Sequence, residues 1–355
     1  MFKTAGGPGA RSGILTINGS ELITPTYFAS TRRGAIPHLT PDNYPAVPLA
    51  TVYNEDFHEA LSPSSKRSEC FMKREYLVLN AKGVFSLSSH HFGDREKKVK
   101  NDVDNNFAIT LHTMHGGNSH PVSALANDMV NTKVDFVVVP HDSASLSQGS
   151  RIGKNRVRKM ETRTLEWIKL FRATVDKNAP GTPVVATINM ELSTPAFLSS
   201  IDSMVDGYFL IPSDSRLADN VVPVPDTTKL RICGAKVSYF DMLDLIGKGI
   251  DVLETQIDQY SEAGVALTFD LNCTSRQFSI DLNDSCYTTD MSTLGDTRFA
   301  KAYLHHLLNA REMTAQVALQ KHNLEVVDKF FSDIRNAIED GTFDTKAANF
   351  KSHYN

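Results

Sequence analysis

A histidine beside an aspartate is the pair whose residue types could support acid–base chemistry in this sequence. His141 and Asp142 follow an apolar run, 135–139, that predicts a buried strand. Enzymes built on parallel α/β barrels keep their reactive groups at the carboxyl ends of the strands. At such a position the imidazole could act as a base that the carboxylate orients. The sequence shows no third group for this site, which favours a capping or loop role for the pair.

Three further histidines lie close together and raise the question of a metal site. His112, His115 and His120 occur in a segment that is rich in glycine and asparagine. A loop of this composition with scattered histidines is usually polar surface. The neighbouring pair His90-His91 carries no stronger signal. We therefore expect polar surface here, and the sequence leaves the role of these histidines open.

Clusters of lysine and arginine are the candidate contacts for a phosphate backbone. The main cluster lies between Arg151 and Arg163, at the start of a predicted helix, and contains Arg156, Arg158 and Lys159. A charged helix face is often only solvated, so binding of phosphates and plain solvation are both open. Weaker clusters occur at Lys66-Arg67, Lys73-Arg74 and Arg95–Lys100.

Alternating strands and helices must position these side chains. Short apolar runs rich in β-branched residues alternate with helical patterns, which indicates βα units around a parallel sheet that is buried on both faces. No glycine-rich phosphate loop opens any of the helices, so a Rossmann or P-loop nucleotide site has no support. The predicted strands are 135–139, 183–188, 207–211, 230–233 and 265–271, and the predicted helices are 155–176, 195–204 and 239–248.

The C-terminal third is predicted to be helical. All 15 prolines lie between Pro8 and Pro225, so no later proline interrupts a helix. Apolar residues recur at helical spacing from Thr297 to Lys321 and again from Val327 to Ile338. These patterns predict two amphipathic helices that are joined near His322-Asn323.

The composition is that of a globular protein. The 355 residues are 41% hydrophobic and 22% charged with a net charge of -4, which excludes disordered, collagen-like and coiled-coil classes. Four widely spaced cysteines are too few for a disulfide framework, and the sequence contains neither a signal-peptide core nor a membrane-spanning stretch. We expect a cytoplasmic protein with no integral membrane segment, in which any nucleic-acid contact is a local patch.

Several short motifs follow one another in an informative order. They are Gly13-Ile-Leu-Thr, Thr24-Pro25-Thr26, Pro37-His-Leu-Thr-Pro41, Gly234-Ala-Lys-Val-Ser-Tyr, Lys248-Gly-Ile-Asp251, Ala302-Tyr-Leu-His-His-Leu307 and Lys321-His-Asn-Leu324. In this order they resemble the tRNA-guanine transglycosylase family, whose members exchange a guanine base in tRNA for a deazaguanine. The resemblance implies a (β/α)8 TIM-type barrel over residues 1–272 and a C-terminal helical, degenerate zinc-binding subdomain over 273–355. Residues 53–118 match the family poorly.

The resemblance assigns Glu254 to the position of the family's nucleophile, an aspartate that attacks the ribose. The extra methylene of glutamate displaces the carboxylate by about an ångström, which alone can reduce the rate by about 10²-fold. The segment 86–93 lacks the family's Gly-Gly-Phe-Gln pattern around its second carboxylate, 140–142 replaces the element that reads the guanine edge, and Ile211-Pro212 replaces a Gly-Gly turn. These departures imply that the chain has no catalytic residue and resembles the family's non-catalytic subunit. Residues 155–159 are also similar to the basic start of a helix in that subunit.

The resemblance also implies a zinc site, which the family forms from Cys-x-Cys-x-x-Cys and the histidine of a His-Asn pair. Cys286 and His322 remain of this set, and Asp284 is a candidate third ligand. Closed structural zinc sites have four ligands. We therefore expect a vestigial site that is held by packing, with zinc binding as the alternative, and the resemblance implies no other cofactor.

The resulting hypothesis is a subunit that is no enzyme on its own. It forms a heterodimer with a catalytic queuine tRNA-ribosyltransferase subunit, which exchanges guanine for queuine at the tRNA wobble position, and it contacts tRNA through Arg156, Arg158 and Lys159. One alternative is a divergent barrel enzyme that uses Glu254 as nucleophile together with His141 or Asp142. Another is an inactive, homodimeric tRNA-binding protein.

Overall fold

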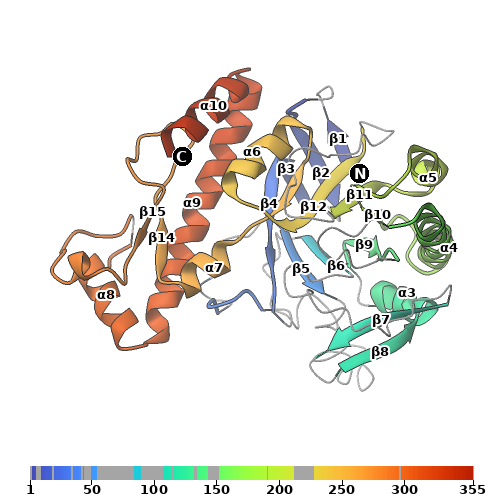
Figure 1. Ribbon diagram of the computed structural model, residues 1–355, viewed down its shortest axis with the longest axis horizontal. Helices are drawn as coiled ribbons and strands as arrows, with labels where there is room; N and C mark the ends of the chain where they lie inside the picture. The colour runs from blue at the N-terminus through green and yellow to red at the C-terminus, as the bar shows by residue number, and fades with distance from the viewer. Residues whose placement is uncertain are drawn as a thin grey trace.

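Eight parallel strands form a closed barrel in the computed structural model of the chain (Figure 1). Around the barrel they pair in the order β4, β5, β6, β9, β10, β11, β12 and β13, and β13 closes the ring by pairing with β4. The predicted α/β barrel is thereby confirmed, and the carboxyl ends of all eight strands meet at one rim. The strands are β4 (Thr26–Ser30), β5 (Leu49–Tyr53), β6 (Val84–Ser88), β9 (Phe136–Val139), β10 (Val184–Asn189), β11 (Gly207–Ile211), β12 (Leu230–Lys236) and β13 (Val252–Glu254).

The structure describes residues 2–4, 9–17, 20–32, 35–40, 43, 49–53, 84–88, 107–113, 116–131, 134–142, 152–189, 191–211, 228–295 and 297–354. For β5, β6 and residues 17, 20, 30, 112, 113 and 116–118 it describes the backbone alone. The predicted basic clusters at 66–74 and 95–100 lie outside the described residues.

The apolar runs become strands because both of their faces are buried. In β9, Phe136 and Val138 point into the barrel, whereas Val137 and Val139 join the larger cluster between the strands and the helices. Space inside the barrel is limited at Gly234 of β12, where a Cβ would lie 2.0 Å from the ring of Phe209. A continuous apolar pattern is therefore required, which is what the sequence shows.

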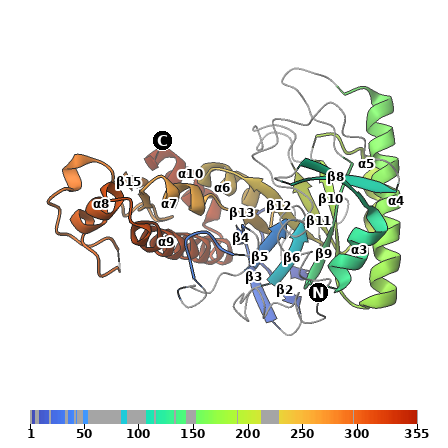
Figure 2. The ribbon, with the colours of Figure 1, turned by 90° about the horizontal axis from the view of Figure 1, so that it is seen from below.

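Helices cover the outside of the barrel. α4 (Lys154–Asn178) lies on the opposite side of the barrel from α9 (Met313–Glu339), as Figures 1 and 2 show. The single tryptophan, Trp167, is 1% exposed on the buried face of α4. The other helices of this region are α3 (Val122–Asn131), α5 (Pro195–Ile201), the 3-10 helix η3 (Asp202–Met204), α6 (Tyr239–Gly247) and α7 (Ile257–Glu262), and β7 (Ala108–Thr113) pairs with β8 (Gly116–Pro121) in a separate hairpin.

A small antiparallel sheet belongs to the amino ends of the barrel strands. It consists of β1 (Phe2–Thr4), β2 (Gly13–Ile17) and β3 (Ser20–Thr24). Leu15 packs into the interior cluster of the barrel. Nearby, Arg11 donates to both oxygens of Asp251, at 2.9 Å and 2.6 Å, and Asp251 directly precedes β13. This buried ion pair ties the N-terminal segment to the last strand at the end of the barrel opposite to the carboxyl rim.

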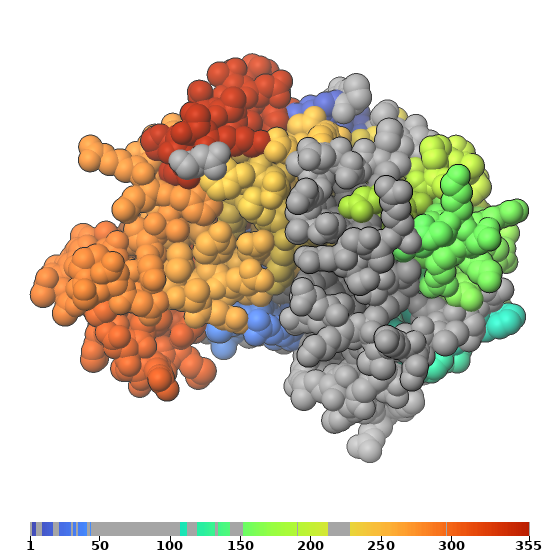
Figure 3. All heavy atoms as spheres, in the orientation of Figure 1, coloured from blue at the N-terminus to red at the C-terminus, as the bar shows by residue number. Residues whose placement is uncertain are grey.

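The C-terminal third forms a separate lobe beside the barrel (Figures 1 and 3). It contains β14 (Val265–Leu267), β15 (Ser279–Asp281), the 3-10 helix η4 (Ser285–Tyr287), α8 (Lys301–Asn309), α9 and α10 (Phe343–Tyr354). The predicted strand at 265–271 is shorter than expected and pairs with β15 rather than with a barrel strand. The domain boundary at 272/273 stays a prediction.

The predicted helix junction at His322-Asn323 is wrong. α9 runs through both residues without a break, and the chain turns instead at Ala310–Glu312, where Arg311 adopts a left-handed conformation with φ of 57°. The His-Asn pair looks like a polar interruption in the sequence. In the structure both side chains are buried and hydrogen-bonded, so they are compatible with a continuous helix.

None of the helices that the structure describes has an apolar stretch long enough to cross a bilayer. Three described cysteines, Cys233, Cys273 and Cys286, are free thiols.

Candidate functional site

Glu254 lies at the carboxyl rim of the barrel because it is the last residue of β13. Strand pairing places it beside Phe28 of β4 and Lys236 of β12, and it is 1% exposed. Burial, together with the nearby Glu254 carboxylate, raises the pKa of the Cys233 thiol to about 12. Cys233 is therefore no nucleophile at neutral pH, which leaves the Glu254 carboxylate as the candidate for nucleophilic chemistry on β13.

A second carboxylate at the rim, Asp142, is fully buried and held by two arginines. Arg156 Nη2 lies 3.1 Å from its Oδ1, and Arg163 Nη1 lies 3.0 Å from its Oδ2. The backbone N–H of Asp142 donates to the hydroxyl of Thr164. Both carboxylate oxygens thus form ion pairs with arginines of α4. Each of these charge-assisted hydrogen bonds is stronger than a neutral one.

The arginine pair is the group that sequence reasoning missed beside His141 and Asp142. Arg156 and Arg163 are seven residues apart, which places them on one face of a helix after two turns. They border the buried stripe of α4, so they can reach the end of β9. The stripe consists of Met160, Thr164, Trp167, Ile168, Phe171 and Val175.

The space next to His141 and Asp142 is small. His141 is 5% exposed and lines, with Asn189 and Phe197, a cavity of about 20 Å³. That volume holds about one water molecule and no purine base. The described cavity that His141 and Asp142 line is therefore too small for a base.

Ion pairs also neutralise the acidic residues that follow Glu254. Lys236 Nζ lies 2.9 Å and 3.0 Å from the two oxygens of Asp258. Arg32 Nη2 lies 2.8 Å from Glu262 Oε1 and 3.9 Å from Asp258 Oδ2. These contacts link β12, α7 and the segment after β4. Asp258 and Glu262 therefore help to hold these elements together at the rim.

The three predicted tRNA contacts have different environments. Arg156 is engaged with Asp142, although its side chain keeps 39% of its exposure. Arg158 and Lys159 are exposed on the first turns of α4, and neither forms an ion pair with a residue that the structure describes. Only the latter two are available to a phosphate without breaking an internal contact.

The histidines of the hairpin do not come together as a described cluster. His120 pairs with Ile109 across β7 and β8. The backbone of His112 pairs with Gly117, but its side chain and all of His115 lie outside what the structure describes. The metal interpretation of these three residues therefore stays untested.

Cys286 and His322 do not form a zinc site with described residues. No group of three His, Cys, Asp or Glu side chains in the described ranges could hold a metal ion. Cys286 is exposed in η4, and the carboxylate of Asp284 accepts the backbone N–H of Cys286 at 3.0 Å. His322 Nε2 lies 2.8 Å from the carbonyl oxygen of Leu267. A tetrahedral site needs four converging ligands, which this arrangement does not supply.

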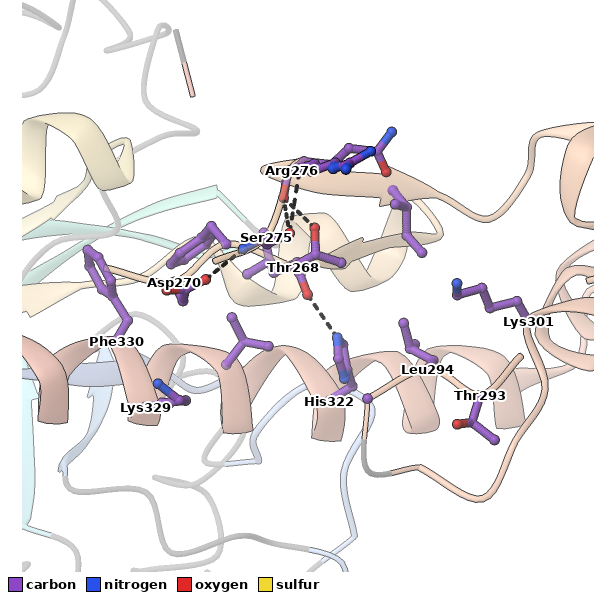
Figure 4. Close-up of a pocket in the computed structure, with 16 residues that line it drawn as sticks. Thr268, Asp270, Ser275, Arg276, Thr293, Leu294, Lys301, His322, Lys329 and Phe330 are labelled. Atoms are coloured by element: carbon purple, nitrogen blue, oxygen red, sulfur yellow. Dashed lines mark hydrogen bonds between the residues drawn. The ribbon is translucent and has the colours of Figure 1, made fainter. Parts of the chain in front are cut away.

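A cavity of about 560 Å³ lies beside His322, between α9 and the loops that follow β14 and β15 (Figure 4). Arg276, Lys301 and Lys329 contribute cationic side chains to its lining, but Lys301 pairs with Asp290 and Lys329 pairs with Asp333. Cys286 is not among the residues that line it.

Comparison with known proteins gives these features a context. The family model for queuine tRNA-ribosyltransferase matches residues 7–355 of the chain. The chain is 28% identical to queuine tRNA-ribosyltransferase accessory subunit 2 of Schizosaccharomyces pombe, over 98% of this chain and 82% of that protein. It is 30% identical to the accessory subunit 2 of Aedes aegypti over 46% of this chain and 45% of that protein. It is 23% identical to a queuine tRNA-ribosyltransferase-like protein of Plasmodium falciparum over 92% and 93% of the two chains.

Proposed function

Because the chain belongs to the queuine tRNA-ribosyltransferase family, we propose that it is a non-catalytic accessory subunit of the enzyme that exchanges guanine for queuine at the tRNA wobble position. The catalytic subunit, a second and different chain, carries out the exchange. This chain contributes part of the subunit interface and part of the tRNA contact. The similarity to the Schizosaccharomyces pombe accessory subunit, which extends over 98% of the chain, supports this assignment.

The observation that carries the proposal is the state of Asp142. A carboxylate that reads a guanine edge must present free oxygens to the base. The oxygens of Asp142 are instead 3.1 Å and 3.0 Å from two arginine side chains, and the residue has no exposed surface. Recognition of a base by Asp142 would require breaking a buried ion pair, which is strongly unfavourable.

The position of Glu254 agrees with this proposal. The exchange reaction needs a carboxylate placed to attack the ribose, then loss of guanine and entry of the new base. A glutamate at that position displaces its oxygens by about an ångström relative to aspartate, and small misplacements can reduce rates by about 10²-fold. Arg158 and Lys159 on α4 are the proposed tRNA contacts of this subunit, since both are exposed.

Base exchange tests the proposal directly. The purified chain alone is expected to incorporate no labelled guanine into tRNA, whereas a mixture with the catalytic subunit is expected to do so. In that mixture, Glu254→Gln in this chain is expected to leave the exchange rate unchanged. The matched control is the equivalent carboxylate-to-amide change at the nucleophile of the catalytic subunit, which should abolish exchange.

A divergent enzyme is the second candidate, because Glu254 is a buried carboxylate at the face where barrel enzymes carry out chemistry. Exchange by the chain alone that disappears in Glu254→Gln would establish this candidate and refute the accessory role. A size measurement tests the third candidate, an inactive homodimer. A stable 1:1 complex with the catalytic subunit supports the proposal, while homodimers that persist in its presence contradict it.

A further inference from the structure

The His322-Asn323 pair on α9 hydrogen-bonds to the backbone of β14. His322 Nε2 donates to the carbonyl oxygen of Leu267 at 2.8 Å. Asn323 Oδ1 accepts the N–H of the same residue at 2.8 Å, and Asn323 Nδ2 donates to the carbonyl oxygen of Val265 at 3.0 Å. Asn323 is 0% exposed and His322 is 6% exposed. Two adjacent helix residues therefore satisfy three buried backbone groups of one short strand.

These contacts determine the chemical state of the histidine. A carbonyl oxygen can only accept, so Nε2 carries the proton, and the ring lone pair through which the histidine could bind a metal is on Nδ1. The backbone of Gly295 passes close to the other edge of the ring, because a Cβ on Gly295 would lie 2.9 Å from Nδ1 and Cε1 of His322. The ring is thus enclosed between β14 and the Thr293–Gly295 segment, and Cys286 is exposed in η4 and does not line the cavity beside the ring.

Local hydrogen bonds hold the loop that precedes α8. His305 is 8% exposed, its Nδ1 lies 2.8 Å from the carbonyl oxygen of Leu282, and its Nε2 lies 2.8 Å from Asn309 Nδ2. Asp290 accepts from the backbone N–H and the hydroxyl of Ser292 at 2.8 Å and 2.6 Å. Direct hydrogen bonds therefore link α8 to the segment after β15 and hold the loop at Asp290.

We propose that the C-terminal lobe folds without zinc, and that hydrogen bonding of His322 and Asn323 to β14 takes the structural place of the metal. Both residues act as positioning residues that hold β14 against α9. The inference stands independently of the proposed accessory role, because it concerns how the lobe folds and not what the chain does.

Metal content and chelator response test the proposal in the full-length chain. The chain, expressed in medium that contains zinc and purified without chelator, is expected to hold well under 0.1 zinc per chain by elemental analysis. Addition of 1,10-phenanthroline is expected to leave Tm unchanged. About one zinc per chain, with a fall in Tm on chelation, would overturn the proposal.

Paired variants of His322 distinguish a hydrogen-bond donor from a ligand. His322→Gln can keep an N–H donor near Leu267, whereas His322→Leu keeps bulk and leaves the carbonyl unsatisfied. We expect His322→Leu to lower Tm by several degrees more than His322→Gln, since a buried unsatisfied group is costly. Equal losses of stability accompanied by loss of bound zinc in both variants would contradict the proposal.

Asn323 provides a second, metal-free readout. Asn323→Ala removes partners from Leu267 and Val265 together, so amide hydrogen exchange of β14 is expected to accelerate by at least 10-fold while α4 is unaffected. Exposed Asn336 of α9 is the matched control, and Asn336→Ala is expected to change neither segment. Unchanged protection of β14 in Asn323→Ala would remove the basis for the proposed role of the pair.

Discussion

Asp142 has no exposed surface, and two arginines of one helix neutralise its charge. Arg163 is the more deeply placed of the two, with 21% of its side chain exposed against 39% for Arg156. At the scale of single residues, the basic start of α4 thus divides into inward arginines that stabilise the rim and outward cations that are free for a partner. Charge alone does not distinguish these two roles, whereas burial does.

Arg163→Ala is expected to lower the free energy of unfolding by about 1–3 kcal/mol, because it removes one of two cations from a buried carboxylate. The matched control is Arg158→Ala on the exposed face of the same helix, which is expected to change the free energy of unfolding by less than about 0.5 kcal/mol. Urea unfolding of both variants makes the measurement. Equal stability of the two variants would show that Asp142 does not depend on Arg163.

At the scale of elements, α4 and α9 serve opposite sides of the barrel (Figures 1 and 2). α4 presents Arg158 and Lys159 to solvent near the carboxyl rim. α9 spans 27 residues and is shared between two clusters, because Leu319 packs in the C-terminal cluster while Phe331 packs in the cluster around the barrel. One long helix thus joins the lobe to the barrel.

Charge reversal on α4 tests the proposed tRNA contact. The double variant Arg158→Glu, Lys159→Glu is expected to weaken tRNA binding by the complex. It is also expected to reduce the slope of log Kd against log salt by about 1.4–1.8, since each phosphate contact contributes about 0.7–0.9. The control is Lys169→Glu, farther along the same helix. If the double variant binds tRNA with unchanged affinity and unchanged salt dependence, Arg158 and Lys159 are solvated surface residues and not tRNA contacts.

The loop after β14 is expected to be sensitive to acid through Asp270. Partial burial raises the pKa of this carboxyl, but hydrogen bonds from the Thr274 hydroxyl and from the N–H groups of Ser275, Thr274 and Asn272 outweigh it, and the pKa is lowered. A lowered folded-state pKa stabilises the loop above the unfolded-state value, and this stability is lost as pH falls through the folded-state value.

Hydrogen exchange of residues 271–277 should therefore be slow at pH 5, after correction for the intrinsic rate, and faster below about pH 4. Asp270→Asn is expected to remove this dependence on pH. A wild-type loop that is equally protected on both sides of pH 4 would contradict the role assigned to Asp270.

At the scale of the whole molecule, a polar link connects the first barrel strand to α9. The Tyr27 hydroxyl donates to Asp328 Oδ1 at 2.9 Å, and Arg335 Nη1 donates to the carbonyl oxygen of Pro25 at 3.0 Å. The rings of Tyr27 and Phe331 lie 5.4 Å apart. β4 is also the strand that closes the barrel against β13, so the same segment supports Glu254 and anchors the C-terminal lobe.

Tyr27→Phe is expected to keep the ring packing and to remove the donor to Asp328, with a loss of about 1–2 kcal/mol at pH 7. Burial raises the pKa of Asp328, so the ionised carboxylate is disfavoured in the folded state. A raised folded-state pKa means that stability falls as pH rises through it. The Tyr27 hydroxyl partly offsets this effect, because its hydrogen bond favours the ionised carboxylate. The loss of stability in Tyr27→Phe should therefore be larger at pH 7 than at pH 4. Thermal unfolding at both pH values measures it. A loss that does not vary with pH would exclude this link.

Local patterns predicted βα units around a parallel sheet, and the family resemblance implied that the sheet closes into a barrel. The run 135–139 predicts a strand because parallel strands that are buried on both faces are mainly apolar. The arginine pair of Asp142, the partners of Asp258 and the continuity of α9 through His322-Asn323 could not be predicted in this way. Each depends on a residue that is distant in sequence and becomes a neighbour only after folding, as Lys236 does for Asp258.

The sequence by itself determined the α/β barrel, the helical C-terminal third and the family, because apolar periodicity and motif order are properties of the linear chain. The tertiary structure alone decided which charges face inward. Arg156 and Arg158 are two residues apart and equally basic in sequence, but only Arg156 reaches Asp142. A helix turns by about 200° over two residues, so adjacent basic residues of one motif point to a buried carboxylate and to solvent.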